Sequence, residues 1–132
     1  MKTNFEMVKE FHKAFLKNDP ETPIDITKET PELLSMVKLR KNLIEEEYNE
    51  VMYELTEVES IEHIAKELVD LLYVVYGTGS EFGIDLDKCF AEVHRSNMSK
   101  LGDDGKPIVR EDGKFLKSDR YEKPNLKRIL NV

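Results

Sequence analysis

The sequence predicts an all-α protein: a bundle of four helices followed by a small C-terminal β-hairpin. Up to about residue 100, apolar side chains recur at the three- and four-residue spacing of amphipathic helices. The pattern then changes to two short runs around Asp112-Gly113, a dipeptide typical of tight hairpin turns. A chain of 132 residues suits one domain with a core of its own. We therefore expect a single domain over residues 1–132.

The expected elements follow from periodicity and from helix-breaking residues. The helices span about residues 4–16, 32–55, 60–78 and 86–100, and the hairpin spans about residues 106–118. In the first helix, Phe5, Val8, Phe11 (or His12) and Phe15 repeat at helical spacing. Residues 17–31 contain three prolines and are expected to form a loop, and loops of this length are usually functional or disordered.

Capping residues and glycines set the expected ends of the later helices. Ser60 can cap the third helix at its start, and Gly77 and Gly79 are expected to loosen its end. Asp85 or Asp87 can cap the fourth helix.

The charges are divided unevenly along the chain. Residues 1–93 hold ten Lys and Arg against 21 Asp and Glu, whereas residues 94–132 hold ten against six, so the net charges are −11 and +4. An acidic body disfavours non-specific binding to a nucleic acid polymer. An acidic body with a basic tail suits a divalent cation together with phosphates, although a solvated acidic surface would have the same composition.

The apolar runs and the cysteine content bear on the compartment. No apolar run approaches the ~20 residues that a membrane helix needs, so no membrane partner is expected. Cys89 is the single cysteine, which leaves no intrachain disulfide and suits a reducing cytosol. We expect a cytoplasmic protein in which Cys89 occupies an ordinary core position.

One carboxylate interrupts the most apolar segment, LVDLLYVVY from Leu68 to Tyr76. A helix that is apolar on nearly all sides is normally buried. An unpaired, ionised Asp70 would cost several kcal/mol or more there. We therefore expect Asp70 to be protonated, paired or bound to a metal.

Further carboxylates lie at positions that can meet Asp70. On the second helix, Glu47 belongs to a largely apolar stripe, and Glu46 and Glu50 lie on the same side of the helix. On the third helix, Glu67 precedes Asp70 by three residues, so the two lie one turn apart on the same side. The two stripes consist of Leu33, Val37, Arg40, Ile44, Glu47 and Val51, and of Ile61, Ile64, Ala65, Leu68, Leu72 and Val75, the second of which is expected to pack inward. Because a short turn joins the helices, they should be antiparallel neighbours with facing carboxylates. Such crowding should raise pKa values, and Mg²⁺ or Mn²⁺ would relieve it.

The alternative is that EEEYNE is a solvated acidic run and that Asp70 pairs with a lysine or an arginine such as Arg40. For EEEYNE alone this alternative is the better reading. The position of Asp70 within an apolar run, with paired acids on consecutive helices, favours the metal site.

The acidic motif and several further runs together resemble a known family. EEYNE at 46–50 followed by ELVD at 67–70 matches the EExxE…ExxD signature of the all-α nucleotide pyrophosphohydrolases, such as MazG-like enzymes, dimeric dUTPases, dCTP pyrophosphatases and phosphoribosyl-ATP pyrophosphohydrolase. The runs that resemble a MazG-like subgroup are EFH at 10–12, LR..LIEEE at 39–47, DLLYVVYGT at 70–78, FGID at 82–85, EVHRSNMSKL at 92–101, DGKPI at 104–108 and DGK..K…Y..P.L at 112–126. The resemblance therefore covers almost the whole chain.

This resemblance implies a MazG-type helical bundle that cleaves a nucleoside triphosphate between its α and β phosphates, giving a monophosphate and pyrophosphate. By position it implies that Glu47, Glu50, Glu67 and Asp70 bind Mg²⁺, with Mn²⁺ as a substitute. It also implies that Glu46 is a secondary ligand or helps to orient and deprotonate the attacking water. A house-cleaning role on non-standard or excess nucleotides would fit.

The basic tail supplies candidates for binding the rest of the nucleotide. They are Arg95, Asn97, Lys100, Lys114, Lys117 and Tyr121. An amide can serve a sugar or a base, and a lysine can meet a phosphate. Basic residues at a helix end also simply oppose the helix dipole, and hairpin lysines often serve solubility.

Two other function classes stay open: a nucleotide sensor of the same fold without turnover, and an acidic helical interaction protein without a site. Intact acidic motifs favour the enzyme over the sensor. Helices with broad apolar faces in so short a chain predict a homo-dimer or tetramer, as is usual in the family. The spacing of residues does not select a nucleobase.

Overall fold

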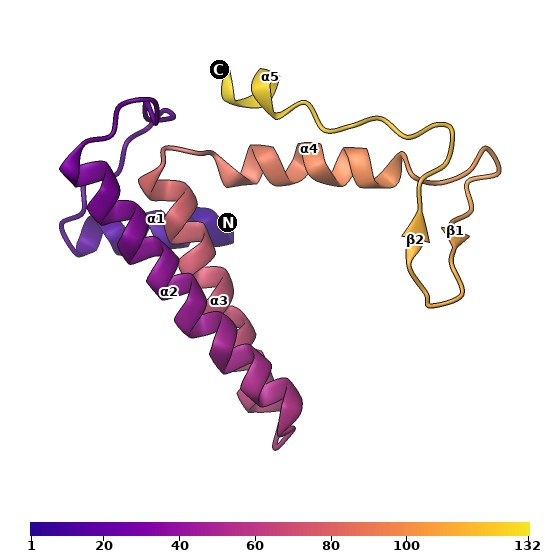
Figure 1. Cartoon of the computed structure of the whole chain (residues 1–132), viewed down its shortest axis with the longest axis horizontal. Coiled ribbons are helices and arrows are strands. Elements are labelled where there is room, and N and C mark those ends of the chain that lie inside the picture. Colours follow the sequence, from indigo (N-terminus) through magenta and orange to yellow (C-terminus); the bar gives the residue numbers. More distant parts are fainter. The chain divides into compact units, whose positions relative to one another are not determined.

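The computed structural model describes residues 1–132 and confirms the predicted all-α class with a small hairpin. The chain divides into two compact units, Met1–Ile84 and Asp85–Val132. The first unit contains α1 (Asn4–Ala14), α2 (Pro31–Thr56) and α3 (Ile61–Glu81); the second contains α4 (Leu86–Met98), β1 (Ile108–Val109), β2 (Phe115–Leu116) and α5 (Leu126–Leu130) (Figure 1). The short α5 was not predicted, and the single domain stays a prediction. None of the helices is both long and apolar enough to cross a membrane.

Side-chain caps start each of the four long helices. Thr3 and Glu6 form a reciprocal capping box at α1, and Thr30 caps α2 directly before Pro31. The predicted cap by Ser60 is confirmed, since its hydroxyl accepts the backbone N–H of His63 at 3.1 Å. Of the two aspartates proposed for α4, Asp85 is the cap.

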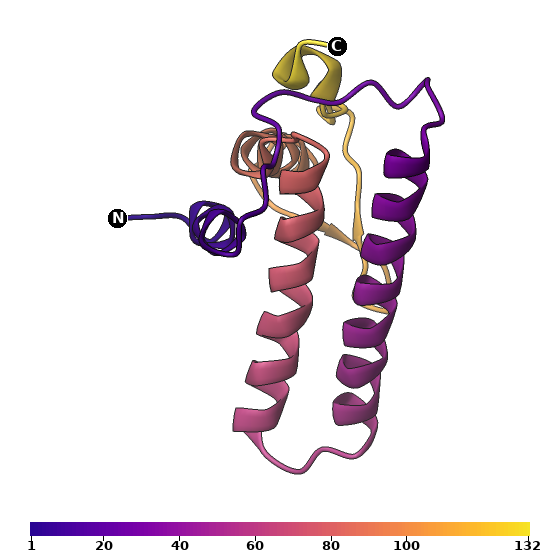
Figure 2. The same cartoon turned by 90° about the vertical axis from the view of Figure 1, so that its left-hand side faces the viewer.

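The first unit is built on an antiparallel pair of helices. α2 and α3 run side by side and are joined by a short connection, while α1 packs against α3 (Figure 2). Phe5 of α1 contacts Tyr76 of α3 with ring centroids 6.1 Å apart, and Val8 and Val51 are also buried. The predicted antiparallel arrangement of the second and third helices is thus present.

The predicted inward stripe of the third helix is wrong for the single chain. Leu68, Leu72 and Val75 are 42%, 48% and 38% exposed. The face that turns toward α2 is displaced around the helix and includes Leu71 and Val74, which are half-buried. The main packing partners of α3 are α1 and α2, and part of the apolar face of this helix stays exposed.

The end of the third helix also differs from the prediction, since α3 continues past Gly77 and Gly79 to Glu81. Both glycines are buried in the helix, and Gly77 lies close to Arg40 and His12. The chain turns instead at Gly83, whose φ of +72° favours glycine. The loop before α2 is fastened at this turn, because Ile24 N–H donates to the Phe82 carbonyl at 3.1 Å.

In the second unit, the C-terminal segment runs back along α4 (Figure 1). Ser96 of α4 donates to the Glu122 carbonyl at 2.7 Å, and the Glu122 N–H donates to Ser99 at 2.9 Å. The predicted hairpin is present: Ile108 pairs with Leu116 and Val109 with Phe115, and Gly113 lies in the turn with a φ of +88°. Cys89 is buried, as expected of a core position.

Candidate metal centre

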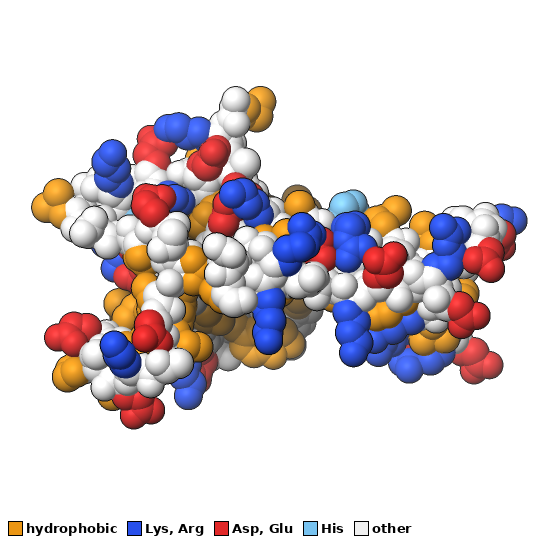
Figure 3. Space-filling model, turned by 90° about the horizontal axis from the view of Figure 1, so that it is seen from above, with side chains coloured by type: hydrophobic (Ala, Val, Ile, Leu, Met, Phe, Trp, Pro, Cys, Tyr) orange, Lys and Arg blue, Asp and Glu red, His pale blue; other side chains and the backbone are white.

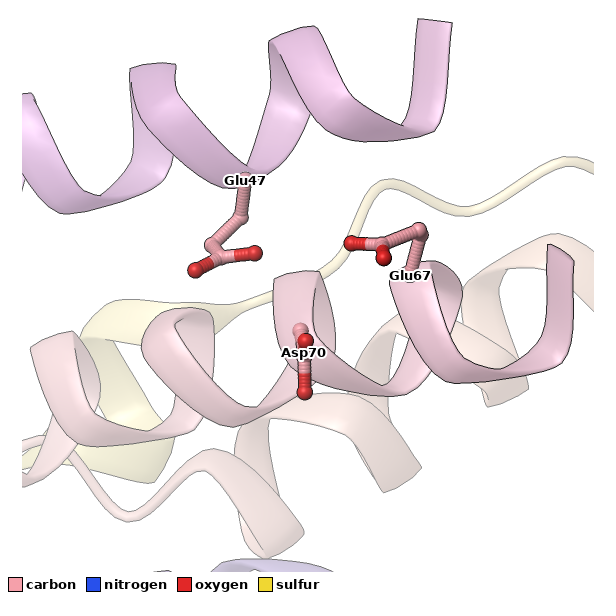
Figure 4. Close-up of side chains that lie close together, drawn as sticks. All are labelled: Glu47, Glu67 and Asp70. Atoms are coloured by element: carbon pink, nitrogen blue, oxygen red, sulfur yellow. The ribbon is translucent and has the colours of Figure 1, made fainter. Parts of the chain in front are cut away.

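Three of the predicted carboxylates meet between α2 and α3. Glu47 points from α2 toward α3, and Glu67 and Asp70 lie on neighbouring turns of α3 (Figure 4). One oxygen from each of the three side chains can be chosen so that all lie within 4.8 Å of one another. This carboxylate cluster, Glu47, Glu67 and Asp70, joins residues that are about twenty positions apart in the sequence.

The electrostatics of the cluster follow the predicted crowding at Glu47. Burial, followed by the negative charges of Asp70, Glu46 and Glu67, raises the pKa of Glu47 above its ordinary value. The side chains of Glu67 and Asp70 are 14% and 37% exposed. Asp70 is therefore half-buried, which is less burial than its apolar neighbours in the sequence suggested.

The ammonium group of a lysine, Lys66, contacts the carboxylate cluster, and the sequence analysis did not identify it. Lys66 Nζ is 2.8 Å from Asp70 and 3.3 Å from Glu67. Hydrogen bonds to Asp70 and then to Glu67 raise the pKa of this lysine. Asp70 thus has a lysine partner, as the alternative reading required, but Arg40 is not that partner. The i, i+4 spacing of Lys66 and Asp70 is the signal that could have revealed the pair.

Lys66 does not bury the carboxylates, because its own side chain is 66% exposed. An exposed lysine on four rotatable bonds can leave the cluster at little cost. Carboxylate oxygens that converge from two rigid helices form a donor set suited to a hard divalent cation such as Mg²⁺ or Mn²⁺. The residues present therefore fit the metal that the sequence suggested.

The other two acidic candidates lie outside the carboxylate cluster. Glu46 and Glu50 are exposed on α2. Glu46 still acts on the cluster through its charge, which contributes to the raised pKa of Glu47. The role of Glu50 as a metal ligand and the role of Glu46 as a secondary ligand or water-orienting group stay predictions.

The candidates for substrate binding all belong to the second unit. The chain after α4 (residues 99–132), called the tail from here on, returns to the end of α4, where the Ser118 N–H donates to the Lys100 carbonyl at 3.1 Å. Lys117 lies over the ring of Tyr121 at 4.6 Å, so these two candidates contact each other. A cavity of about 500 Å³ is lined by Asn97, Met98, Lys100, Leu101, Pro107, Ile108, Phe115 and Leu116. Lys and Arg side chains gather around the hairpin on the face seen in Figure 3.

One of these candidates is engaged within the protein. Arg95 makes a bidentate ion pair with the buried Glu92, at 2.8 and 3.0 Å, and also reaches Glu122. Hydrogen bonds from Arg95 and, to a smaller extent, from the backbone N–H of Asn125 lower the pKa of Glu92 to about 2. Arg95 thus fastens the tail to α4, and its role toward substrate stays a prediction. Lys114 lies in the hairpin turn, where its N–H donates to Asp112 at 3.2 Å.

Comparison with known proteins places the acidic segments within one family profile. Residues 8–97 match the profile of the family described as phosphoribosyl-ATP pyrophosphohydrolase, and the match ends before the hairpin. The chain is 34% identical over 105 residues to the uncharacterized protein L479 of Acanthamoeba polyphaga mimivirus. That alignment covers 80% of this chain but 38% of the viral protein, so the chain spans well under half of this relative.

A solved structure from Exiguobacterium sp. 255-15, named there as a candidate NTP pyrophosphohydrolase, is also similar. The match has 25% identity and a TM-score of 0.47, and it covers 98% of this chain and 92% of that one. This TM-score is too low to bear on fold or function. The family assignment therefore rests on the match over residues 8–97.

Proposed function

Because this chain belongs to the phosphoribosyl-ATP pyrophosphohydrolase family, we propose that it is a Mg²⁺-dependent pyrophosphohydrolase of nucleoside triphosphates. It cleaves the bond between the α and β phosphates and releases a nucleoside monophosphate and pyrophosphate. Non-standard or excess nucleotides are the substrates that fit a house-cleaning role. The family profile supports the reaction class, and the nucleotide itself is our proposal.

The observation that carries this proposal is the convergence of Glu47, Glu67 and Asp70 between two packed helices. Carboxylates that converge from both helices repel one another, and a bound divalent cation would relieve that repulsion. In this proposal Glu50, which is exposed on α2, is the fourth metal ligand. Glu46 orients the attacking water and takes its proton.

The chain's own residues divide the work between metal and substrate. Bound Mg²⁺ would neutralise phosphate charge and lower the pKa of a water molecule. Asn97 and Lys100 contact the sugar, base or phosphates, and Lys114, Lys117 and Tyr121 of the tail add further contacts, with Arg95 holding the tail in position. No side chain has to act as a nucleophile, since water is the attacking group.

We also propose that the protein is a cytoplasmic homo-dimer or tetramer. Leu68, Leu72 and Val75 leave an apolar strip of α3 exposed in the single chain. Beside it, a groove of about 780 Å³ is lined by Val37, Arg40, Lys41, Ile44, Glu45, Tyr48, Leu71, Val75, Thr78 and Phe82. Contiguous apolar surface of this kind is typical of a subunit interface.

A substrate screen tests the proposed function. Purified protein with Mg²⁺ is incubated with each common and modified nucleoside triphosphate and with phosphoribosyl-ATP, and released pyrophosphate is measured. We expect turnover of one or more triphosphates in the wild type, none in Glu47→Gln, and unchanged turnover in Glu45→Gln, which removes one charge outside the cluster. Turnover of phosphoribosyl-ATP alone would replace the proposed substrate. Tight nucleotide binding without any turnover would favour the sensor.

A further inference from the structure

A buried arginine connects the two helices that carry the carboxylate cluster. Arg40 of α2 is 5% exposed, and its guanidinium reaches three groups of α3. Nε donates to Thr78 Oγ1 at 3.0 Å, Nη2 donates to the Val74 carbonyl at 2.9 Å, and Nη1 lies 3.4 Å from Glu81. Because the guanidinium is planar and rigid, three partners on one helix fix its position along that helix.

The surroundings of Arg40 are shaped to hold it. A Cβ atom at Gly77 would lie 2.6 Å from Arg40 Nη2 and 2.9 Å from His12 Nε2, so a larger residue there would displace these side chains. His12 is buried and pairs with Asp19, which also accepts a hydrogen bond from Ser80 at 2.6 Å. Residues of α1, the following loop and α3 therefore close around the arginine.

The contacts of Arg40 and the carboxylate cluster share one helix register. Seven residues after Arg40 on α2 lies Glu47, and seven residues before Val74 on α3 lies Glu67. In an antiparallel pair, equal steps in opposite directions lead to residues that again face each other. Seven residues are about two helical turns, so the faces are preserved as well. The contacts of Arg40 and the contacts within the carboxylate cluster therefore depend on the same alignment of α2 with α3.

We propose that Arg40 is a positioning residue that sets the register of α2 against α3 and thereby holds Glu47 opposite Glu67 and Asp70. This inference rests on the proposed metal site for its consequence in metal binding. Its structural part concerns the protein without metal. A slip of one residue would move Glu47 about 1.5 Å along the pair and turn it by about 100° away from the other two carboxylates.

Two variants disturb the register in different ways, and a third serves as a control. Arg40→Lys keeps the charge but cannot reproduce the planar fork, and Gly77→Ala keeps Arg40 but displaces it. Val8→Ala removes packing from the buried core of α1 and leaves all contacts of Arg40 in place. The control therefore lowers stability without touching the α2–α3 register.

The first measurement is the affinity for Mn²⁺ alone, from the electron paramagnetic resonance signal of the free ion. We expect Arg40→Lys and Gly77→Ala to bind Mn²⁺ about tenfold or more weakly than the wild type, the effect usual for residues that orient metal ligands. Val8→Ala should bind Mn²⁺ as the wild type does, although it unfolds at a lower temperature.

The second measurement reads the register without metal. Spin labels on cysteines placed at Lys38 of α2 and Glu62 of α3, both exposed, report a distance along the helix pair. Cys89 is replaced by serine, and labelled chains are diluted with unlabelled ones to suppress distances between chains. We expect one narrow distance in the wild type and in Val8→Ala, and a broadened or shifted distance in both register variants.

The outcomes separate this inference from the proposed function. An unchanged distance in both register variants, or an equal change in Val8→Ala, would overturn it, because Arg40 would then contribute only to general stability. A changed distance with unchanged Mn²⁺ affinity would overturn its link to the carboxylates. If the wild type binds no Mn²⁺ while the distance changes as expected, the proposed metal site fails and the register role of Arg40 stands.

Discussion

Replacing Glu47 by glutamine tests the carboxylate cluster most directly, because it keeps the shape of the side chain and removes one charge. Unit charges 4.8 Å apart, the upper limit within the cluster, repel by about 1 kcal/mol in water and about 3 kcal/mol at an effective dielectric constant of 20. The cluster is partly exposed and faces Lys66, so the lower value applies. We expect Glu47→Gln to stabilise the metal-free protein by about 1 kcal/mol at most, or about 3 °C in Tm.

The pH dependence of this gain has a defined sign. Because the folded-state pKa of Glu47 is raised, its charged form destabilises the protein at every pH above that value. The gain from Glu47→Gln is therefore full at neutral pH and shrinks as the pH falls through the raised pKa. It is absent below the ordinary glutamate pKa of 4.5, where the side chain is protonated in both states.

Addition of Mg²⁺ should reverse the order of the two proteins. At a free Mg²⁺ concentration a hundred times the dissociation constant, the wild type gains about 2.7 kcal/mol. The variant lacks a ligand and should gain much less. Thermal unfolding followed by circular dichroism, with Mg²⁺ and with a chelator, measures both effects. Glu45→Gln is the matched control, since it removes one exposed charge from α2 outside the cluster and should keep the full Mg²⁺ response. A less stable metal-free Glu47→Gln with an undiminished Mg²⁺ response would refute the metal site.

Four further outcomes are expected. Asp70→Asn should lower pyrophosphate release by several orders of magnitude in the substrate assay, while its Tm without metal stays level or rises, because the lost ion pair is with an exposed lysine that keeps Glu67. The contribution of Glu92, whose pKa Arg95 lowers to about 2, is full above pH 4.5 and is lost toward pH 2, so Glu92→Gln should flatten the acid limb of the unfolding curve. Gly83→Ala should cost more than the about 1–3 kcal/mol of its positive φ of +72° in denaturant unfolding, since the Cβ would also lie 2.0 Å from the Thr22 carbonyl oxygen. Sedimentation at micromolar concentration should show a dimer or tetramer, and a lone 15.4 kDa species would contradict the oligomer.

The sequence was sufficient for the elements that depend on local signals. Ser60 and Asp85 cap the helices as predicted, and Asp112-Gly113 forms the hairpin turn. Gly77 was misread, because its role depends on Arg40 and His12, which approach it from other helices. A glycine that ends a helix and a glycine that admits a neighbour look alike in one sequence.

The candidate site was predictable where it rests on helical spacing. The i, i+3 pair on α3 and the stripe position of Glu47 predicted the convergence that the structure shows. The partner of Asp70 was missed although its i, i+4 spacing from Lys66 indicates it, because a long lysine side chain has several carboxylates within reach. The inward stripe of α3 was misplaced, since periodicity gives the apolar face of a helix but does not say which neighbour covers it.

The attachment of the tail to α4 has a consequence for how this chain can diverge. Ser96 and Ser99 hold Glu122 by its carbonyl and N–H, and Glu92 accepts the N–H of Asn125, so the path of the tail is recognised through its main chain. Any residue except proline presents the same N–H group, and every residue presents the same carbonyl. Side chains along the tail can therefore be exchanged while the path is kept. Homologues should differ at such tail positions and retain the serines and the glutamate of α4.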